Sequence, residues 1–258
     1  MNEAHGPGAP PRRGRGIYLL PNLLTTGGLF GGFFAIIAAS QGRYEAACVA
    51  IFVAAIMDGV DGRVARMTHT QSEFGVQYDS LADLVSFGMA PALVMYHWSL
   101  VSMKAFGPVA GKAGWLAAFA YAACAALRLA RFNSQVASVD KRWFVGLASP
   151  AAAGLMASFV WVMHDLGYPG DAWLPVALPL TVVVGLLMVS RIRYHSFKGS
   201  GDGARAERVP FAFLIGAVAV LVALVLDPPK VLLAAATAYA LSGPALWLWR
   251  RARGRSPA

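Results

Sequence analysis

Charged residues are scarce in this chain of 258 residues, of which they form only 14%. A soluble domain of ordinary composition has about a quarter of its residues charged. Hydrophobic residues form 57% of the chain, and its mean hydropathy is +0.55. This balance excludes an ordinary soluble domain and predicts one compact domain whose main solvent is lipid.

Cysteine is scarcer still, because Cys48 and Cys124 are the only two in the sequence. Each lies within an apolar run, without the spacing of metal ligands and without a nearby partner. We therefore expect two small core residues and no disulfide.

The chain also lacks the residue alternation of a membrane barrel, and no repeat of about 20–50 residues is visible. It has instead eight apolar runs, each close to the about 17–25 residues with which a helix crosses a bilayer. These patterns predict an all-α integral membrane protein, a bundle of about eight transmembrane helices. The runs lie at roughly 21–40, 44–64, 79–101, 113–132, 150–167, 173–191, 209–226 and 229–249.

Basic residues number 22 against 13 acidic ones, which gives a net charge of +9. With the N-terminus in the cytoplasm, the predicted topology follows the positive-inside rule. An even number of spans then returns the C-terminus to the cytoplasm. Anionic headgroups account for the excess charge, so we expect membrane lipid and not nucleic acid as its partner. The basic residues left outside are Arg43, Lys104, Lys112 and Lys230.

Both ends of the chain are basic. Residues 1–16 are rich in proline, glycine and arginine and are expected to be a disordered tail, and 251–258 form a second basic tail. A cleavable signal peptide is not expected, because the apolar run after the first tail continues into a full-length span.

The few carboxylates are unevenly distributed, since five of the 13 fall between positions 58 and 83. Asp58 and Asp61 are three residues apart, and Asp79 and Asp83 are four apart, so each pair shares one helix face. Like charges gathered near a membrane repel each other unless a cation compensates them. All-oxygen ligands favour Mg²⁺, Mn²⁺ or Ca²⁺ over Zn²⁺. Simple pairing with arginines is the alternative, and it accounts for the charges but not for the spacing.

Small residues lie beside the first pair of carboxylates. Gly59, Gly62 and Ala65 clear bulk from one helix surface, for which close packing of another helix and close approach of a ligand are both explanations. Arg63 and Arg66 add the cations that a phosphate-bearing substrate would require.

The stretch as a whole reads D-x2-D-G-x2-A-R-x8-G-x3-D-x3-D, from Asp58 to Asp83. It resembles the signature of the CDP-alcohol phosphotransferase family, with every fixed position matched. The resemblance implies a multi-helix membrane enzyme that transfers a substituted phosphoryl group from a CDP-linked donor to an alcohol and releases CMP.

The same resemblance implies roles for individual residues. Asp58, Asp61 and Asp79 would bind divalent metal, either Mg²⁺ or Mn²⁺, and Asp83 would complete this metal site. Asp83 is the candidate base, and the division of the catalytic role between Asp79 and Asp83 stays open. The nucleotide would lie against Gly62, Ala65, Arg66 and Gly75.

Four further stretches resemble the bacterial branch of this family that makes phosphatidylserine and CMP from CDP-diacylglycerol and L-serine. They are PNLLTTGGLFGGFFAI, DSLADLVSFGMAPA, ALRLARFN and FVGLASPAAAG. The resemblance covers about residues 17–200, a catalytic core of about six helices, and leaves 201–250 as two additional helices. It implies a homodimer in the bacterial inner membrane with the site facing the cytoplasm.

Several polar residues have two readings each. Arg128 and Arg131, followed by Asn133, are candidates to bind serine or phosphate, and ordinary positive-inside anchoring accounts for the arginines equally well. Asn22 and Thr25 are candidates to bind nucleotide or to cap a helix after Pro21. Glycerol 3-phosphate is the main alternative acceptor, and a divalent-cation transporter is the alternative from another class.

Overall fold

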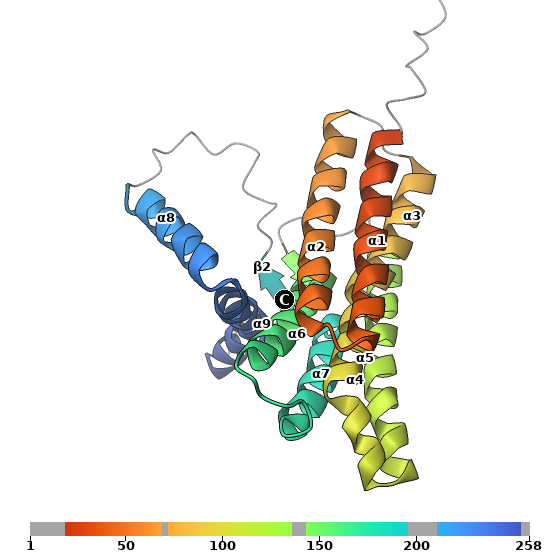
Figure 1. Cartoon of the computed structure of the whole chain (residues 1–258). Helices are drawn as coiled ribbons and strands as arrows, with labels where there is room; N and C mark the ends of the chain where they lie inside the picture. The colour runs from red at the N-terminus through yellow and green to blue at the C-terminus, as the bar shows by residue number, and fades with distance from the viewer. Residues whose placement is uncertain (1–18, 69–71, 136–142, 196–210, 254–258) are drawn as a thin grey trace, which may run out of the picture.

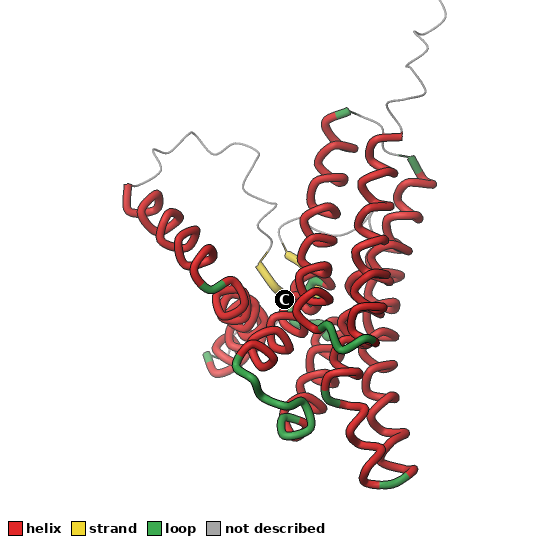
Figure 2. The backbone as a smooth tube through the Cα atoms, in the orientation of Figure 1, coloured by secondary structure: helices red, strands yellow, loops and turns green. Residues whose placement is uncertain are grey.

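The computed structural model describes residues 19–68, 72–135, 143–195 and 211–253 (Figure 1). The predicted tail 1–16 and residues 254–258 of the predicted tail 251–258 lie outside this part. Helices form nearly all of it, as predicted (Figure 2). The helices are α1 Leu19–Ser40, α2 Tyr44–Met67, α3 Glu73–Asp83, α4 Ala90–Trp98, α5 Pro108–Gln135, α6 Ser149–Asp165, α7 Leu174–Val189, α8 Phe211–Leu226 and α9 Pro228–Ala252.

Two short helical segments of other winding lie between these helices. Leu84–Met89 is a π-helical turn that joins α3 to α4, and Leu100–Phe106 is a 3₁₀ helix before α5. The strands found in the described residues are β1 Trp143–Val145 and β2 Arg193–His195, which pair antiparallel. They connect the chain after α5 to the chain after α7.

Each of the eight apolar runs coincides with helix, but the helices differ in how well they suit a bilayer. Three of them, α1, α5 and α9, are long and apolar enough to cross by themselves. Residues Glu73–Phe106 form a fourth candidate, bent by 44°. α6, α7 and α8 have only 17, 16 and 16 residues. Length and composition therefore support three or four spans among the described residues, and eight crossings remain a prediction.

Small residues allow the first helices to pack closely. α1 lies alongside α2, α3 and α4. Figure 1 shows α1, α2 and α3 next to each other. A Cβ added at Gly31 would lie 3.1 Å from the carbonyl oxygen of Ala50 and 3.2 Å from the Cβ of Ala54, so α1 and α2 approach almost backbone to backbone. Such contacts drive helix association where lipid removes the usual hydrophobic force.

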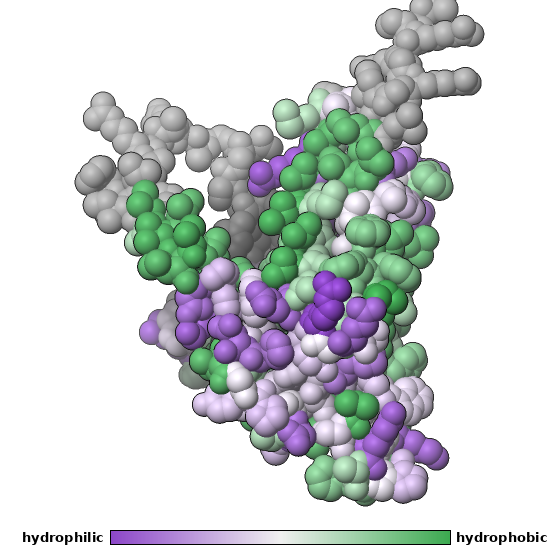
Figure 3. Space-filling model, in the orientation of Figure 1, coloured by the Kyte–Doolittle hydropathy of each residue, from purple (hydrophilic) through white to green (hydrophobic). Residues whose placement is uncertain are grey.

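Large apolar side chains face outward on several helices. On α2 they are Val49, Val53, Ile56 and Val60, spaced as one helix face. Figure 3 shows a similar apolar surface over α8, which packs chiefly against α9. Acyl chains would cover such faces in a bilayer.

The two cysteines are free, as predicted. Cys48 is buried in the core and Cys124 is half-buried.

Candidate metal centre

Two consecutive helices bring the four aspartates together. Asp58 and Asp61 lie near the C-terminal end of α2, and Asp79 and Asp83 lie on α3, which follows a short connection. Ser72 starts α3 by accepting a hydrogen bond from the backbone N–H of Gly75 at 3.0 Å. The chain thus reverses at one end of the bundle, and both pairs of carboxylates face the same small cavity.

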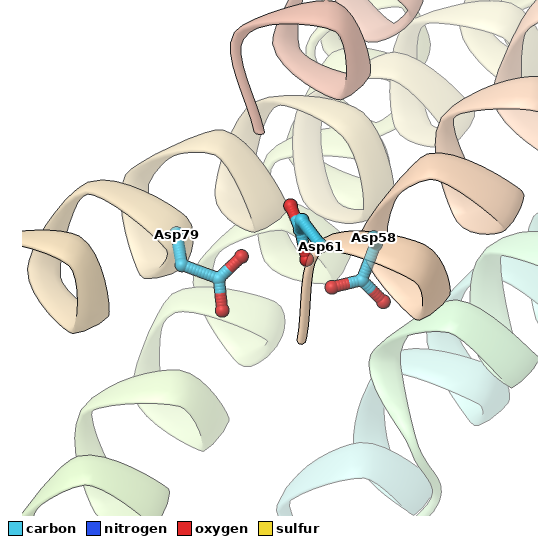
Figure 4. A group of neighbouring side chains, drawn as sticks. All are labelled: Asp58, Asp61 and Asp79. Atoms are coloured by element: carbon cyan, nitrogen blue, oxygen red, sulfur yellow. The ribbon is translucent and has the colours of Figure 1, made fainter. Parts of the chain in front are cut away.

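Three of these carboxylates converge on one point. Asp58, Asp61 and Asp79 each offer an oxygen atom, and these oxygens lie within 4.8 Å of one another. Figure 4 shows the three side chains directed toward a common space. Oxygens at about 2.1 Å from a shared Mg²⁺ are at most about 4.2 Å apart. Small side-chain rotations would therefore bring all three into contact with one ion.

The environment of Asp61 supports the fit of a hard cation. Its side chain is buried, with 4% exposed, and Thr25 of α1 donates a hydrogen bond to its Oδ2 at 2.8 Å. This bond orients the carboxylate but does not neutralise its charge. A buried carboxylate next to two others is costly without a cation, so the donor set fits a divalent metal.

Asp83 lies in the same cavity but outside the three-oxygen group. The cavity is also lined by Thr25, Gly28, Ser86 and Phe87. Asp83 is close enough to the other three aspartates and to Arg128 to interact electrostatically with them. It is thus placed next to the candidate metal ligands without being one of the convergent three.

Gly59 and Gly62 of α2 are not packed against another described helix. A Cβ added at Gly59 would meet nothing within 4 Å, and one added at Gly62 would meet only Arg66, at 3.6 Å. Gly62 and Ala65 are partly exposed, and Arg63 and Arg66 are exposed. This surface of α2 is therefore open within the described part of the chain, and the approach of a ligand to it stays a prediction.

Asn22 and Thr25 do not cap a helix. α1 already begins at Leu19, so both residues and Pro21 lie within it. The capping interpretation was wrong. It placed the start of the helix after Pro21, but proline is tolerated within a first helical turn, so Pro21 does not show where the helix begins. Thr25 reaches Asp61, and Asn22 lies beside Gly75, where an added Cβ would be 3.7 Å from its Oδ1.

The two arginines of α5 have different surroundings. Arg131 donates to the carbonyls of Val145 and Val189 at 3.0 and 3.1 Å, so it fastens β1 to the end of α7. Arg128 is buried, donates to Ser149 at 2.8 Å, and its Nε has no partner among the described residues. Only Arg128 is close enough to Asp83 to act on it electrostatically.

The side chain of Asn133 forms a hydrogen bond with a neighbouring helix. Its amide nitrogen donates to the hydroxyl of Ser80 at 2.9 Å, next to Asp79 in sequence. This contact links the end of α5 to α3.

Sequence reasoning overlooked two groups around the site. Ser149 holds Arg128, and Tyr78 makes a hydrogen bond of 2.9 Å with Thr26 across α3 and α1. Tyr78 directly precedes Asp79, which was a usable signal. Nothing in the sequence links Ser149 to Arg128.

Four aspartates at one end of a helical membrane-type bundle define a candidate divalent-metal centre. The chain matches the family model described as CDP-alcohol phosphatidyltransferase over residues 18–242. The chain therefore belongs to this family, which depends on divalent metal.

Similar proteins include enzymes from bacteria and an archaeon. The CDP-diacylglycerol–serine O-phosphatidyltransferase of Helicobacter pylori is 38% identical over 182 residues, which cover 70% of this chain and 74% of that protein. The protein of the same name from Mycobacterium tuberculosis is 42% identical over 161 residues, 60% of this chain and 54% of its own. The archaetidylserine synthase of Methanothermobacter thermautotrophicus is 33% identical over 184 residues, 70% and 72% of the two chains.

Proposed function

We propose that this protein transfers the phosphatidyl group of CDP-diacylglycerol to the hydroxyl of L-serine and so forms phosphatidylserine and CMP. The convergence of three carboxylates on one point, in a chain of this family, is the observation that carries the proposal. The names of the similar proteins favour serine as acceptor over glycerol 3-phosphate. The only such acidic group in the described residues lies at one end of the helices, which disfavours a transport path across the bilayer.

In this proposal Asp58, Asp61 and Asp79 hold the divalent ion, either Mg²⁺ or Mn²⁺. When bound, such an ion supplies positive charge to the diphosphate of the donor. Thr25 keeps the buried carboxylate of Asp61 in its orientation through the 2.8 Å hydrogen bond. The three ligands thereby fix where the diphosphate lies relative to the membrane.

Asp83 acts as the base. Its carboxylate takes the proton of the serine hydroxyl while the serine oxygen attacks the phosphorus that bears diacylglycerol. The bond between that phosphorus and the bridging oxygen breaks, and CMP leaves with the electron pair. The position of Asp83 beside the three convergent oxygens, but outside their group, supports this assignment over one as a fourth ligand.

The remaining substrate contacts follow from the surfaces next to the site. The cytidine lies over the open face of α2, with Gly62 and Ala65 beneath it and Arg66 at its edge. Gly75, Asn22 and Thr25 border this face from α3 and α1. Arg128 is the candidate partner for the carboxylate of serine or a donor phosphate, because its Nε is buried and directed to no described group. Arg131 and Asn133 support the site by holding β1 and α3.

We place the protein in the bacterial inner membrane with eight crossings and the site on the cytoplasmic side. The diacylglycerol tails then stay in the bilayer, and serine and the nucleotide come from water. Residues 17–200 would form the catalytic core, with 201–250 as two additional helices. A homodimer is the expected assembly.

An acceptor panel tests the proposal. Purified protein in detergent with CDP-diacylglycerol and Mn²⁺ or Mg²⁺ is offered labelled L-serine, glycerol 3-phosphate, inositol phosphate and choline in parallel. We expect labelled lipid and CMP release with serine, and neither after chelation of the metal. Lipid product with another acceptor and none with serine would contradict the acceptor assignment.

A further inference from the structure

The helix that carries Asp79 and Asp83 changes its winding directly after Asp83. Residues Leu84–Met89 form the π-helical turn. The backbone N–H of Ala90 donates to the carbonyl of Val85, five residues earlier, where an α-helix would use the fourth. Such turns are rare and occur frequently at functional sites.

Tyr121 of α5 donates a hydrogen bond to this turn. In an α-helix the carbonyl of Phe87 would accept from residue 91, but Pro91 has no N–H. The fully buried hydroxyl of Tyr121 donates to that carbonyl at 3.2 Å. Because Pro91 cannot donate to this carbonyl and a buried acceptor benefits from a donor, the bond from Tyr121 stabilises the turn.

α1 holds the turn from another side. The hydroxyl of Ser86 donates to the carbonyl of Gly28 at 3.0 Å. A Cβ added at Gly32 would lie 2.5 Å from the Oγ of Ser86 and 2.6 Å from its Cα, so only glycine allows this approach. The turn is therefore fixed by α1 and α5 together.

The turn changes the rotation of one continuous helical segment, so that the part before it and the part after it can face different surroundings. An α-helix rotates by about 100° per residue, and a π turn accommodates one extra residue. Before the turn, Asp79 and Asp83 face the cavity. After it, α4 packs into the core with a buried face that includes Val94 and Met95. In an uninterrupted α-helix, either the aspartates would be turned away from the cavity or the buried face of α4 would be turned away from the core, in each case by about 100°.

We propose that the π turn is a positioning device, which directs Asp83 into the site while α4 keeps its packing face. Tyr121 is a positioning residue that acts through the backbone of the turn. The proposal rests on the proposed role of Asp83 as the base.

Tyr121→Phe tests it by removing one hydroxyl. We expect kcat to fall about 10- to 100-fold, because a small misplacement of a catalytic group has effects of this size. The KM for CDP-diacylglycerol and the affinity for Mn²⁺, measured by titration calorimetry, should change less than about twofold, since neither depends on the base. The acid limb of the kcat profile against pH, which reports the base in the bound complex, should shift.

Tyr44→Phe is the matched control. Its hydroxyl also donates to a backbone carbonyl of α4, that of His97 at 2.9 Å, away from the π turn. We expect wild-type kcat and an unshifted acid limb. Ser86→Ala tests the same turn from α1 and serves if Tyr121→Phe does not fold in detergent.

The outcomes separate this inference from the proposed function. Wild-type kcat and acid limb in Tyr121→Phe and Ser86→Ala, or equal losses in Tyr121→Phe and Tyr44→Phe, would overturn the positioning role alone. Full activity of Asp83→Asn would overturn the base assignment and the positioning role with it. Absence of phosphatidylserine formation by the wild-type protein would overturn the proposed function instead.

Discussion

α2 and α8 are both apolar helices, but they differ in where they carry charge. α8 has no charged residue, and large side chains such as Val218 and Val225 are exposed along it. α2 carries Glu45 in its first turn and is apolar from there to Met57, yet its other end carries Asp58, Asp61 and two arginines. Charge within a bilayer is expensive. On α2 most of the charge lies at the end where Asp58 and Asp61 converge with Asp79 of α3, a cluster that could hold a cation.

The strongest test of this comparison removes a convergent carboxylate. Asp61→Asn keeps the size of the side chain and the possibility of a bond to Thr25 but lowers the charge of the group. We expect phosphatidyl transfer to fall at least about 1,000-fold, equivalent to about 4 kcal/mol, because the metal is held less tightly. Mn²⁺ titration should show weaker binding. Unchanged Mn²⁺ affinity would contradict the assignment of Asp61 as a ligand.

Asp83→Asn separates the base from the ligands. Turnover should fall by about 100- to 10,000-fold, the usual contribution of general base catalysis. Binding of Mn²⁺ and of CMP should remain within about threefold of wild type, because the three convergent oxygens are intact. Isothermal titration with each ligand makes the measurement. Loss of Mn²⁺ binding would instead make Asp83 a fourth ligand.

A pair of glycine variants compares the packed region with the exposed one. Gly32→Ala should destabilise the protein by about 1–3 kcal/mol, because the new Cβ meets Ser86 across the tightest contact between α1 and the π turn. Gly216→Ala on α8 meets nothing within 4 Å. It should leave stability unchanged or raise it by up to about 1 kcal/mol through helix propensity. Thermal unfolding in detergent distinguishes the two, and equal shifts would remove the contrast.

The smallest effect is expected at the arginines of α5. Arg128→Lys should raise the KM for serine about tenfold with a smaller change in stability, since a lysine cannot reproduce the guanidinium geometry. Arg131→Lys should leave that KM unchanged and lower the melting temperature, because it loses bonds to two backbone carbonyls. Steady-state kinetics with varied serine provide the comparison. A raised KM in Arg131→Lys alone would reverse the two roles.

Much of the fold could be predicted because helix periodicity and apolar length are local properties. Each of the eight apolar runs coincides with helix. The spacing of the four aspartates predicted that they meet, and three of them converge while Asp83 lines the same cavity. Their role as metal ligands stays a prediction. The break at Leu84–Met89 was not anticipated. It depends on Tyr121, which lies 34 residues from Phe87, and on close contact with Gly32.

The roles of the polar residues were harder to predict for the same reason. Arg128 and Arg131 are three residues apart and looked equivalent. Arg128 is buried, donates to Ser149 and has an unpartnered Nε among the described residues, whereas Arg131 donates to backbone carbonyls 14 and 58 residues away. Thr25 was a candidate for nucleotide or capping, and its observed partner is Asp61, 36 residues along the chain.

The sequence by itself determined the helical character of the chain, the pairs of carboxylates on single helix faces and the family to which it belongs. These depend on residues within a turn or two of each other, or on fixed gaps in one stretch. Only the tertiary structure decided which three carboxylates converge, which arginine is buried with an unpartnered nitrogen among the described residues, and where the helix changes its winding. Those features depend on how separate helices pack, and packing joins residues whose distance along the chain carries no local signal.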